Sequence, residues 1–285
     1  MASRAPRFAI YAAPGTGPAD TVGLLLREKA EQWLGRSASG DPVPPGVPAG
    51  WTRAALDAMT AGPRRYGFHA TLKPPFRLAG GRTPEELDAA VARFAARTAG
   101  TVIPALSLAR MSGFFALVPG AETPGLRALA DEVVRGFDDF RAPATDAEIA
   151  RRNPARLTPR QNELLAAWGY PYVLDEFRFH LTLTDRIPDS HRPQVERAAR
   201  EWFTPLLGAD VPVDALALFT EAEPGAPFAL HALHALQPAA HPGVPPNQLT
   251  AKEHDVPRNR PQQRPDRLAG GDRARFGPDP RRPDR

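Results

Sequence analysis

Phe-His-Ala-Thr-Leu at residues 68–72 is repeated almost unchanged at residues 179–183 as Phe-His-Leu-Thr-Leu. Both copies are apolar and typical of β-strands. Side chains alternate between the two faces of a strand, so the His and the Thr of each copy share one face. The interleaved Phe, Ala and Leu residues point the other way, into a core. Each copy therefore predicts a strand that buries one face and presents an imidazole and a hydroxyl on the other.

The elements around the two copies repeat in order. Each predicted His strand, at about 65–73 and 177–184, is followed by a helix and two strands. Each is also preceded by a strand and a helix, since RFAIYA at 7–12 corresponds to FFALV at 114–118. Helix starts are marked by Thr-Pro capping boxes at Thr83 and Thr158. A repeat of about half the domain length indicates an internal duplication.

This order predicts an α+β fold: a bilobed, duplicated domain with two mainly antiparallel sheets flanked by helices. The domain covers residues 1–236, with halves of about 1–120 and 121–236. One His strand from each lobe faces a central cleft. The path of residues 139–157 is not determined by the sequence.

Residues 237–285 form a Pro/Arg-rich segment that we expect to be disordered. Ten of its residues are Pro, and its few apolar side chains are isolated. It carries ten basic and six acidic residues, which accounts for the whole net charge of +4. Residues 1–236 hold 26 charges of each sign, so the folded part is neutral and offers little general attraction for nucleic acid.

Composition bounds the environment of the chain. The 285 residues include no Cys, which excludes disulfides and thiolate metal sites. The sequence shows neither a signal peptide nor a spanning segment. We therefore expect a soluble, cytoplasmic protein with no membrane partner.

The paired motifs resemble those of the two-histidine phosphoesterase superfamily, whose signature is one His-x-Thr/Ser-x motif per half of a duplicated domain. The resemblance covers about residues 7–236. The longer strings YGFHATLKPPF and FRFHLTLTDRI are similar to a poorly characterised branch whose genes accompany phosphonate-degradation operons. The resemblance implies a cyclic phosphodiesterase acting on a ribosyl cyclic phosphate or a related small sugar phosphate.

The chemistry of the motifs agrees with this resemblance. Opening a cyclic phosphodiester needs a base to activate water and an acid to protonate the leaving oxygen. His69 and His180 can share these tasks near neutral pH, in either order. Thr71 and Thr182 can donate hydrogen bonds to the non-bridging oxygens. We expect neither a metal ion nor a cofactor.

Strand parity adds three candidate phosphate ligands. Lys73 is expected on the face of His69, and it is one of only three Lys beside 33 Arg. Arg178, together with Thr184, is expected on the face of His180, and Tyr11 is expected to turn toward the cleft. Each also has a structural alternative: a solvated strand-end charge for Lys73, a surface ion pair for Arg178 and a core position for Tyr11.

Three further readings stay open. Both histidines could be hydrogen-bonded core residues, although their matching flanks favour a paired site. The substrate could be the 2′,3′-cyclic phosphate of an RNA end, although the neutral folded part favours a small molecule. The cleft could also bind a phosphate ester or an RNA end without catalysis.

Overall fold

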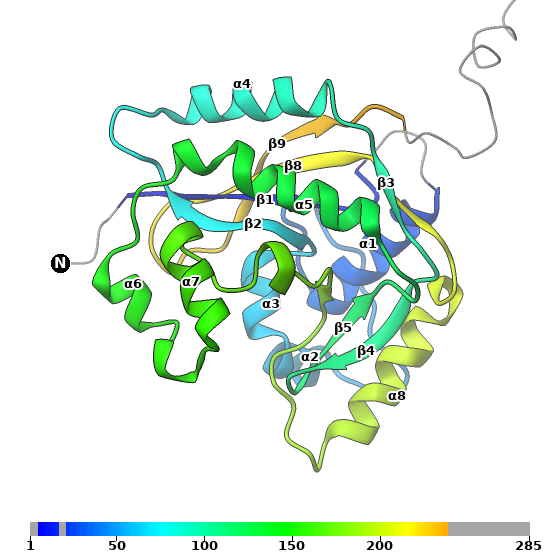
Figure 1. The fold of residues 1–285 in the computed structure, drawn as a ribbon. Helices are drawn as coiled ribbons and strands as arrows, with labels where there is room; N and C mark the ends of the chain where they lie inside the picture. The colour runs from blue at the N-terminus through cyan, green and yellow to red at the C-terminus, as the bar shows by residue number, and fades with distance from the viewer. Residues whose placement is uncertain (1–4, 17–20, 239–285) are drawn as a thin grey trace, which may run out of the picture. The chain divides into compact units, whose positions relative to one another are not determined.

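The chain is built around a seven-stranded antiparallel sheet with the order β4-β5-β6-β2-β1-β8-β9 (Figure 1). The computed structural model describes residues 5–16 and 21–238. The strands of the large sheet are β1 (Arg7–Ala12), β2 (Ala70–Arg77), β4 (Ser107–Met111), β5 (Phe114–Val118), β6 (Leu181–Thr182), β8 (Ala215–Glu221) and β9 (Ala229–Ala235). A second, two-stranded sheet pairs β3 (Thr101–Ile103) with β7 (Val211–Val213). The predicted α+β class with mainly antiparallel sheets is confirmed.

The duplication is visible in the strand order. The two His strands, β2 and β6, are neighbours at the centre of the large sheet. Moving outward, β1 flanks β2 as β5 flanks β6, and β8 flanks β1 as β4 flanks β5. The remaining strands of the repeat, β3 and β7, pair with each other. The two motifs thus meet side by side within one sheet.

The chain halves predicted at about 1–120 and 121–236 exchange strands within the large sheet. Strands β4 and β5 come from the first half of the chain but join β6 of the second half. Strands β8 and β9 come from the second half but extend the sheet beyond β1. Each half of the chain therefore contributes strands to the other half of the sheet.

Eight α-helices surround the sheet in the described part of the chain. They are α1 (Thr21–Leu34), α2 (Arg53–Met59), α3 (Ala61–Tyr66), α4 (Pro84–Ala95), α5 (Pro124–Gly136), α6 (Asp146–Ala150), α7 (Pro159–Trp168) and α8 (Arg192–Phe203). The capping boxes at Thr83 and Thr158 begin α4 and α7 as predicted. The stretch at 139–157, left open by the sequence, contains α6 and 3₁₀ turns at Asp138–Phe140 and Pro154–Arg156. Figure 1 shows α5 across β1 and β2, and α4 along β8 and β9.

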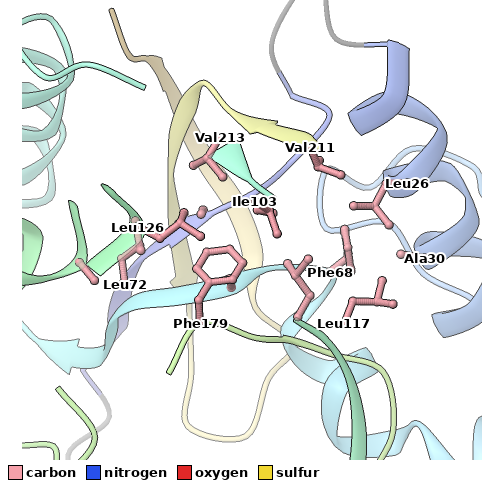
Figure 2. Close-up of a cluster of buried hydrophobic side chains, with 14 of the residues drawn as sticks. Leu26, Ala30, Phe68, Leu72, Ile103, Leu117, Leu126, Phe179, Val211 and Val213 are labelled. Atoms are coloured by element: carbon pink, nitrogen blue, oxygen red, sulfur yellow. The ribbon is translucent and has the colours of Figure 1, made fainter. Parts of the chain in front are cut away.

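One face of the sheet carries the main hydrophobic core. Figure 2 shows Phe68, Leu72 and Phe179 converging with side chains of α1, α5 and the small sheet. Both motif phenylalanines are buried in this cluster. Their burial fixes the register of the His strands, because a slip of one residue would expose them and bury the histidines.

The opposite face carries a smaller apolar cluster built on β1 and β8. It contains Tyr11, Phe219 and Phe228, with Tyr66 packed against it. Adjacent residues of β1 divide between the two faces, since Ile10 belongs to the main core and Tyr11 to this cluster. This second face holds the candidate site.

Strand β2 does not keep a regular alternation. Its register against β1 shifts on both sides of Ile10, where Tyr11 pairs with Thr71 and Ile10 pairs with Lys73. Leu72 is therefore an extra residue, a β-bulge that reverses which face the following residues occupy. The strand also continues through Pro74 and Pro75, which oppose the single residue Ala9. Proline is tolerated there because a bulge does not need its missing N–H.

None of the helices in the described ranges is long and apolar enough to cross a membrane. The predicted disordered segment lies outside the described residues except for Gln237 and Pro238. Gln237 joins the fold by donating its backbone N–H to the Thr98 carbonyl at 2.8 Å.

Candidate active site

The two motifs lie side by side on neighbouring strands at the centre of the sheet. Ala70 of β2 pairs with Leu181 of antiparallel β6. This register sets Thr71 opposite His180 and places His69 at the level of Thr182. Because Ala70 and Leu181 both point into the main core, the four motif residues share the other face. The structure therefore brings together the two His-Thr sets that the sequence predicted.

Both imidazoles are held in the same way. Nδ1 of His69 lies 2.9 Å from the Gly67 carbonyl, and Nδ1 of His180 lies 2.8 Å from the Arg178 carbonyl. A carbonyl can only accept a hydrogen bond, so Nδ1 carries the proton in the neutral form of both rings. Each Nε2 then holds the lone pair. At His69 this atom lies 3.2 Å from the Thr71 hydroxyl, which can donate to it.

His69 lies among aromatic rings. Tyr11 stacks on it with ring centroids 3.8 Å apart and an interplanar angle of 25°, and Tyr66 and Phe219 approach at 6.1 and 6.3 Å. Burial lowers the pKa of His69 to about 4, opposed by its bond to the Gly67 carbonyl and reinforced by the charge of His180. His69 is therefore neutral at pH 7, and the two imidazoles interact electrostatically.

His180 opens onto a cavity of about 450 Å³, here called the histidine cavity. Burial also lowers the pKa of His180, opposed by its bond to the Arg178 carbonyl. Phe114 tilts against the ring at 5.8 Å. The walls that bear on ligand binding are Thr71, Phe114, Tyr170, Tyr172, Arg178 and Arg186. The cavity thus joins the two motifs to aromatic and cationic side chains.

Lys73 does not lie on this face, and the predicted orientation is wrong. It pairs with the core residue Ile10, because the bulge at Leu72 reverses the alternation. Its side chain is 2 % exposed. Its Nζ donates to the Val134 carbonyl of α5 at 2.9 Å and to Asp138 Oδ1 at 3.2 Å. Burial lowers its pKa to about 8 despite the nearby carboxylate. Lys73 therefore anchors α5 to the back of the sheet.

Tyr11 turns to the face of His69 and is buried there, where its ring holds the imidazole. Its hydroxyl is buried without a hydrogen-bond partner in the described part of the structure. Burial raises the pKa of Tyr11 well above its ordinary value. The group thus stays a neutral hydroxyl that can donate to a ligand.

Arg178 is exposed and lines the histidine cavity, so a ligand there can reach its guanidinium. Thr184 is different and does not share this surface. It is buried, its hydroxyl accepts the Phe115 N–H at 3.0 Å, and it donates to the Asp185 carbonyl at 2.8 Å. A bulge shapes this end of the strand too, because the N–H groups of Leu183 and Thr184 both approach the Phe115 carbonyl.

Several residues near the two imidazoles were not predicted from the sequence. Phe114 is the first residue of β5, and Tyr170 and Tyr172 follow α7. Tyr66 ends α3 just before the first motif. Only Tyr66 and Phe114 carried a usable signal, since each adjoins an element of the repeated order. No group of three or more metal-ligating side chains that could hold an ion is found among the described residues.

The sequence of the chain matches a known protein family. The family described as "Protein of unknown function (DUF1045)" matches residues 71–229, more than half of the chain. The chain belongs to the DUF1045 family. The resemblance predicted from the paired motifs spans about residues 7–236 and so includes all of the matched residues.

Two curated relatives of this DUF1045 protein are both named ribose 1,5-bisphosphate phosphokinase PhnN. The one from Janthinobacterium sp. (strain Marseille) is 39 % identical over 210 residues, covering 70 % of this chain and 46 % of the relative. The one from Laribacter hongkongensis (strain HLHK9) is 37 % identical over 228 residues, covering 79 % and 50 %. The DUF1045 protein spans about half the length of these relatives.

Solved structures similar to the DUF1045 protein include Escherichia coli LigT complexed with 3′-AMP. That match has 15 % identity and a TM-score of 0.39, and it covers 82 % of this chain and 99 % of LigT. The protein TT0787 of Thermus thermophilus matches at 18 % identity with a TM-score of 0.34, covering 82 % and 100 %. A structure described as a phosphoesterase matches at 14 % identity with a TM-score of 0.37, covering 81 % and 98 %.

Proposed function

We propose that this DUF1045 protein is a cyclic phosphodiesterase that opens a small ribosyl or sugar cyclic phosphate to a phosphomonoester without a metal ion. The observation that carries the proposal is the cross-strand arrangement of the motifs. Two imidazoles, each with its Nδ1 proton bonded to a backbone carbonyl, share one face with two threonines. This is a preorganised pair of proton-transfer groups with hydroxyl donors between them.

In this mechanism the two histidines have different roles. His69, whose pKa is lowered to about 4, is the neutral base. Its Nε2 takes a proton from water as the water oxygen attacks phosphorus. His180, which opens onto the cavity, is the acid. Its Nε2 proton passes to the ring oxygen as the phosphorus–oxygen bond to that oxygen breaks, leaving a monoester and a free hydroxyl.

The substrate itself sets these protonation states. A phosphate anion beside His180 favours the imidazolium and raises the pKa that burial had lowered. Stacking against Tyr11 keeps His69 desolvated and therefore neutral until it accepts the proton of the attacking water. Thr71 and Thr182 then donate to the non-bridging oxygens, where charge accumulates in the transition state.

The names of the curated relatives support the substrate class. Their name specifies a ribose bisphosphate, and the gene name PhnN agrees with the phosphonate-operon branch that the motifs resemble. The kinase activity in that name is not proposed for this chain, which covers only about half the length of the relatives. A phosphate-binding P-loop requires Gly-Lys, whereas the three lysines of this chain, Lys29, Lys73 and Lys252, follow Glu, Leu and Ala.

An RNA end with a 2′,3′-cyclic phosphate is the alternative substrate. One observation favours it: Tyr172 is 46 % exposed and lines the histidine cavity, as Phe114 does. Exposed aromatic rings beside a phosphate site can stack a nucleobase. A non-catalytic phosphate-ester module would use the same cavity.

Turnover of a panel of cyclic phosphates in the presence of EDTA tests the proposal. The panel contains ribosyl cyclic phosphates, 2′,3′-cyclic mononucleotides and short RNAs with cyclic ends. The wild-type protein is expected to open at least one, best among the ribosyl compounds. The variants His69→Ala and His180→Ala are expected to lose most of the rate but retain binding. Tight binding with no turnover would establish the binding module instead, and loss of activity on chelation would reveal a metal requirement.

A further inference from the structure

A second cavity adjoins the site and is rich in arginine. Its volume is about 890 Å³. Glu148 is the one carboxylate among its lining residues. The six arginines that line it are Arg7, Arg65, Arg77, Arg141, Arg151 and Arg152. It is here called the arginine cavity. The folded part of the chain is neutral overall, so this concentration of positive charge is local and needs its own explanation.

Four of these arginines form ion pairs within the protein. Arg7 and Arg65 both pair with Glu221, a buried carboxylate whose pKa is raised by burial but lowered by more through these contacts, for a net decrease. Arg77 pairs with Glu148 at 3.0 Å, and Arg141 pairs with Asp138 at 2.8 Å. These four arginines face three carboxylates, so the paired set keeps one net positive charge.

Arg151 and Arg152 have no ion pair in the described part of the structure. Both are exposed and lie at the end of α6. Arg152 places its guanidinium 4.7 Å from the centre of the Tyr170 ring. Tyr170 lines the histidine cavity, and the preceding Gly169 lines the arginine cavity. Arg152 therefore lies at the boundary between the two cavities with its donors free.

Neighbouring residues of the same strand line the two cavities, although no residue lines both. Strand β2 gives Thr71 and Pro74 to the histidine cavity and Pro75 and Arg77 to the arginine cavity. At a rise of about 3.3 Å per residue, Thr71 and Pro75 are at most about 13 Å apart. A phosphorylated pentose bound at Thr71, together with an arginine side chain that extends toward it, can span this distance.

The buried hydroxyl of Tyr11, which lines neither cavity, interacts with residues of both. The groups that interact with it electrostatically include Tyr66, Tyr170 and Arg7, which line one cavity or the other. It has no hydrogen-bond partner in the described residues. A buried polar group without a partner is costly in an empty site and is satisfied by a ligand.

From these contacts we infer that the arginine cavity binds a second phosphate of the substrate, a phosphomonoester on the sugar away from the cyclic diester. The inference rests on the proposed function and narrows its substrate to a sugar that carries two phosphates. Arg152 is the principal ligand and Arg151 assists it. A guanidinium suits this task because its fork of donors matches phosphate oxygens.

The test compares two substrates that differ only by the second phosphate: a ribosyl cyclic phosphate and the same compound with a 5-phosphate. The wild-type protein is expected to prefer the phosphorylated compound at least tenfold in kcat/KM. Arg152→Gln should reduce this preference at least about tenfold, because one hydrogen bond to a charged group is worth roughly ten- to a hundredfold in binding. Its kcat/KM on the compound without the 5-phosphate should fall by much less, because that compound has no phosphate for Arg152 to bind.

Arg156→Gln is the matched control. Arg156 is exposed, lies four residues from Arg152 and lines neither cavity, so the same loss of charge there should preserve the preference. A wild-type preference below twofold would overturn the inference. An equal fall on both substrates in Arg152→Gln would also overturn it, since that result indicates a structural role.

Calorimetric titration with ribose 5-phosphate and ribose 1,5-bisphosphate separates this inference from the proposed function. If neither cyclic compound is opened, but bisphosphate binds more tightly than monophosphate and Arg152→Gln abolishes the difference, the subsite stands and the catalytic proposal fails. If the cyclic compounds are opened without preference and the two ligands bind equally, catalysis stands and the subsite fails.

Discussion

The pH dependence of stability gives a quantitative test of the environment assigned to His69. The perturbation is acidification from pH 7.5 to pH 4.5, compared between the wild-type protein and His69→Asn. The Asn side-chain amide can still donate to the Gly67 carbonyl, as Nδ1 of His69 does at 2.9 Å. The variant therefore removes the titration and keeps the local hydrogen bond.

The sign and size follow from the pKa values. Burial holds the pKa of His69 at about 4 in the folded protein, against 6.5 for an ordinary histidine. Between these values the unfolded chain binds more protons than the folded one, so stability falls as the pH falls. Integrating over the interval gives a loss of about 2.5 kcal/mol in the free energy of unfolding at pH 4.5 from this one group.

Urea unfolding at four or five pH values measures this loss in each protein. Other titrating groups contribute equally to both and cancel in the difference. The wild-type protein should lose about 2.5 kcal/mol more than His69→Asn between the two pH values. A difference below about 0.5 kcal/mol, or one of opposite sign, would refute the assignment of His69 as a buried neutral imidazole.

Three substitutions test the other side chains singled out from the sequence. Lys73→Met should keep kcat/KM within about threefold of wild type, because the Lys73 Nζ binds Val134 and Asp138 on the other face of the sheet. A loss above about tenfold would show that Lys73 does contribute to the active site. Tyr11→Phe keeps the ring stack and removes only a hydroxyl without a partner in the described residues, so urea unfolding should show no loss of stability while kcat/KM falls about three- to tenfold. An unchanged rate would mean that this hydroxyl does not contact the substrate. Arg178→Gln should raise KM about three- to tenfold with kcat nearly constant, since its exposed guanidinium can bind substrate and transition state alike; a fall in kcat alone would contradict that role.

The sequence predicted what depends on local pattern. Capping boxes gave the starts of α4 and α7, and the apolar flanks of the motifs gave the strands that carry His69 and His180. The repeated order of elements also predicted that the two motifs would meet. These features follow from periodicity and capping, which act within a few residues.

The failures come from longer-range geometry. Strand parity assigned Lys73 to the cleft because it assumed regular alternation, whereas Leu72 forms a bulge. Pro74 and Pro75 were a signal for such irregularity, since strand prolines occur at edges and bulges. The exchange of β4 and β5 into the other half of the sheet depends on pairing between distant segments, which no local pattern specifies.

The arginine cavity could not be predicted for a different reason. Arginine is so frequent in this chain, at 33 residues, that no single one stands out. Arg152 is informative because it lies over the Tyr170 ring and forms no ion pair with any described residue. Both facts depend on the fold and cannot be taken from the sequence. Likewise, only the structure shows that the Tyr11 hydroxyl is buried without a hydrogen-bond partner among the described residues.

A double-mutant cycle on His69 and His180 tests the central claim most directly. The measurement is kcat/KM on the best cyclic phosphate, in EDTA, for wild type, His69→Ala, His180→Ala and the double variant. If the two imidazoles act on one phosphorus, each single variant should lose about a thousandfold and the double variant little more, because removing either partner disables the pair. A single variant with wild-type activity, or a double variant whose loss is the product of the two single losses, would show that the two imidazoles do not act together on one phosphorus.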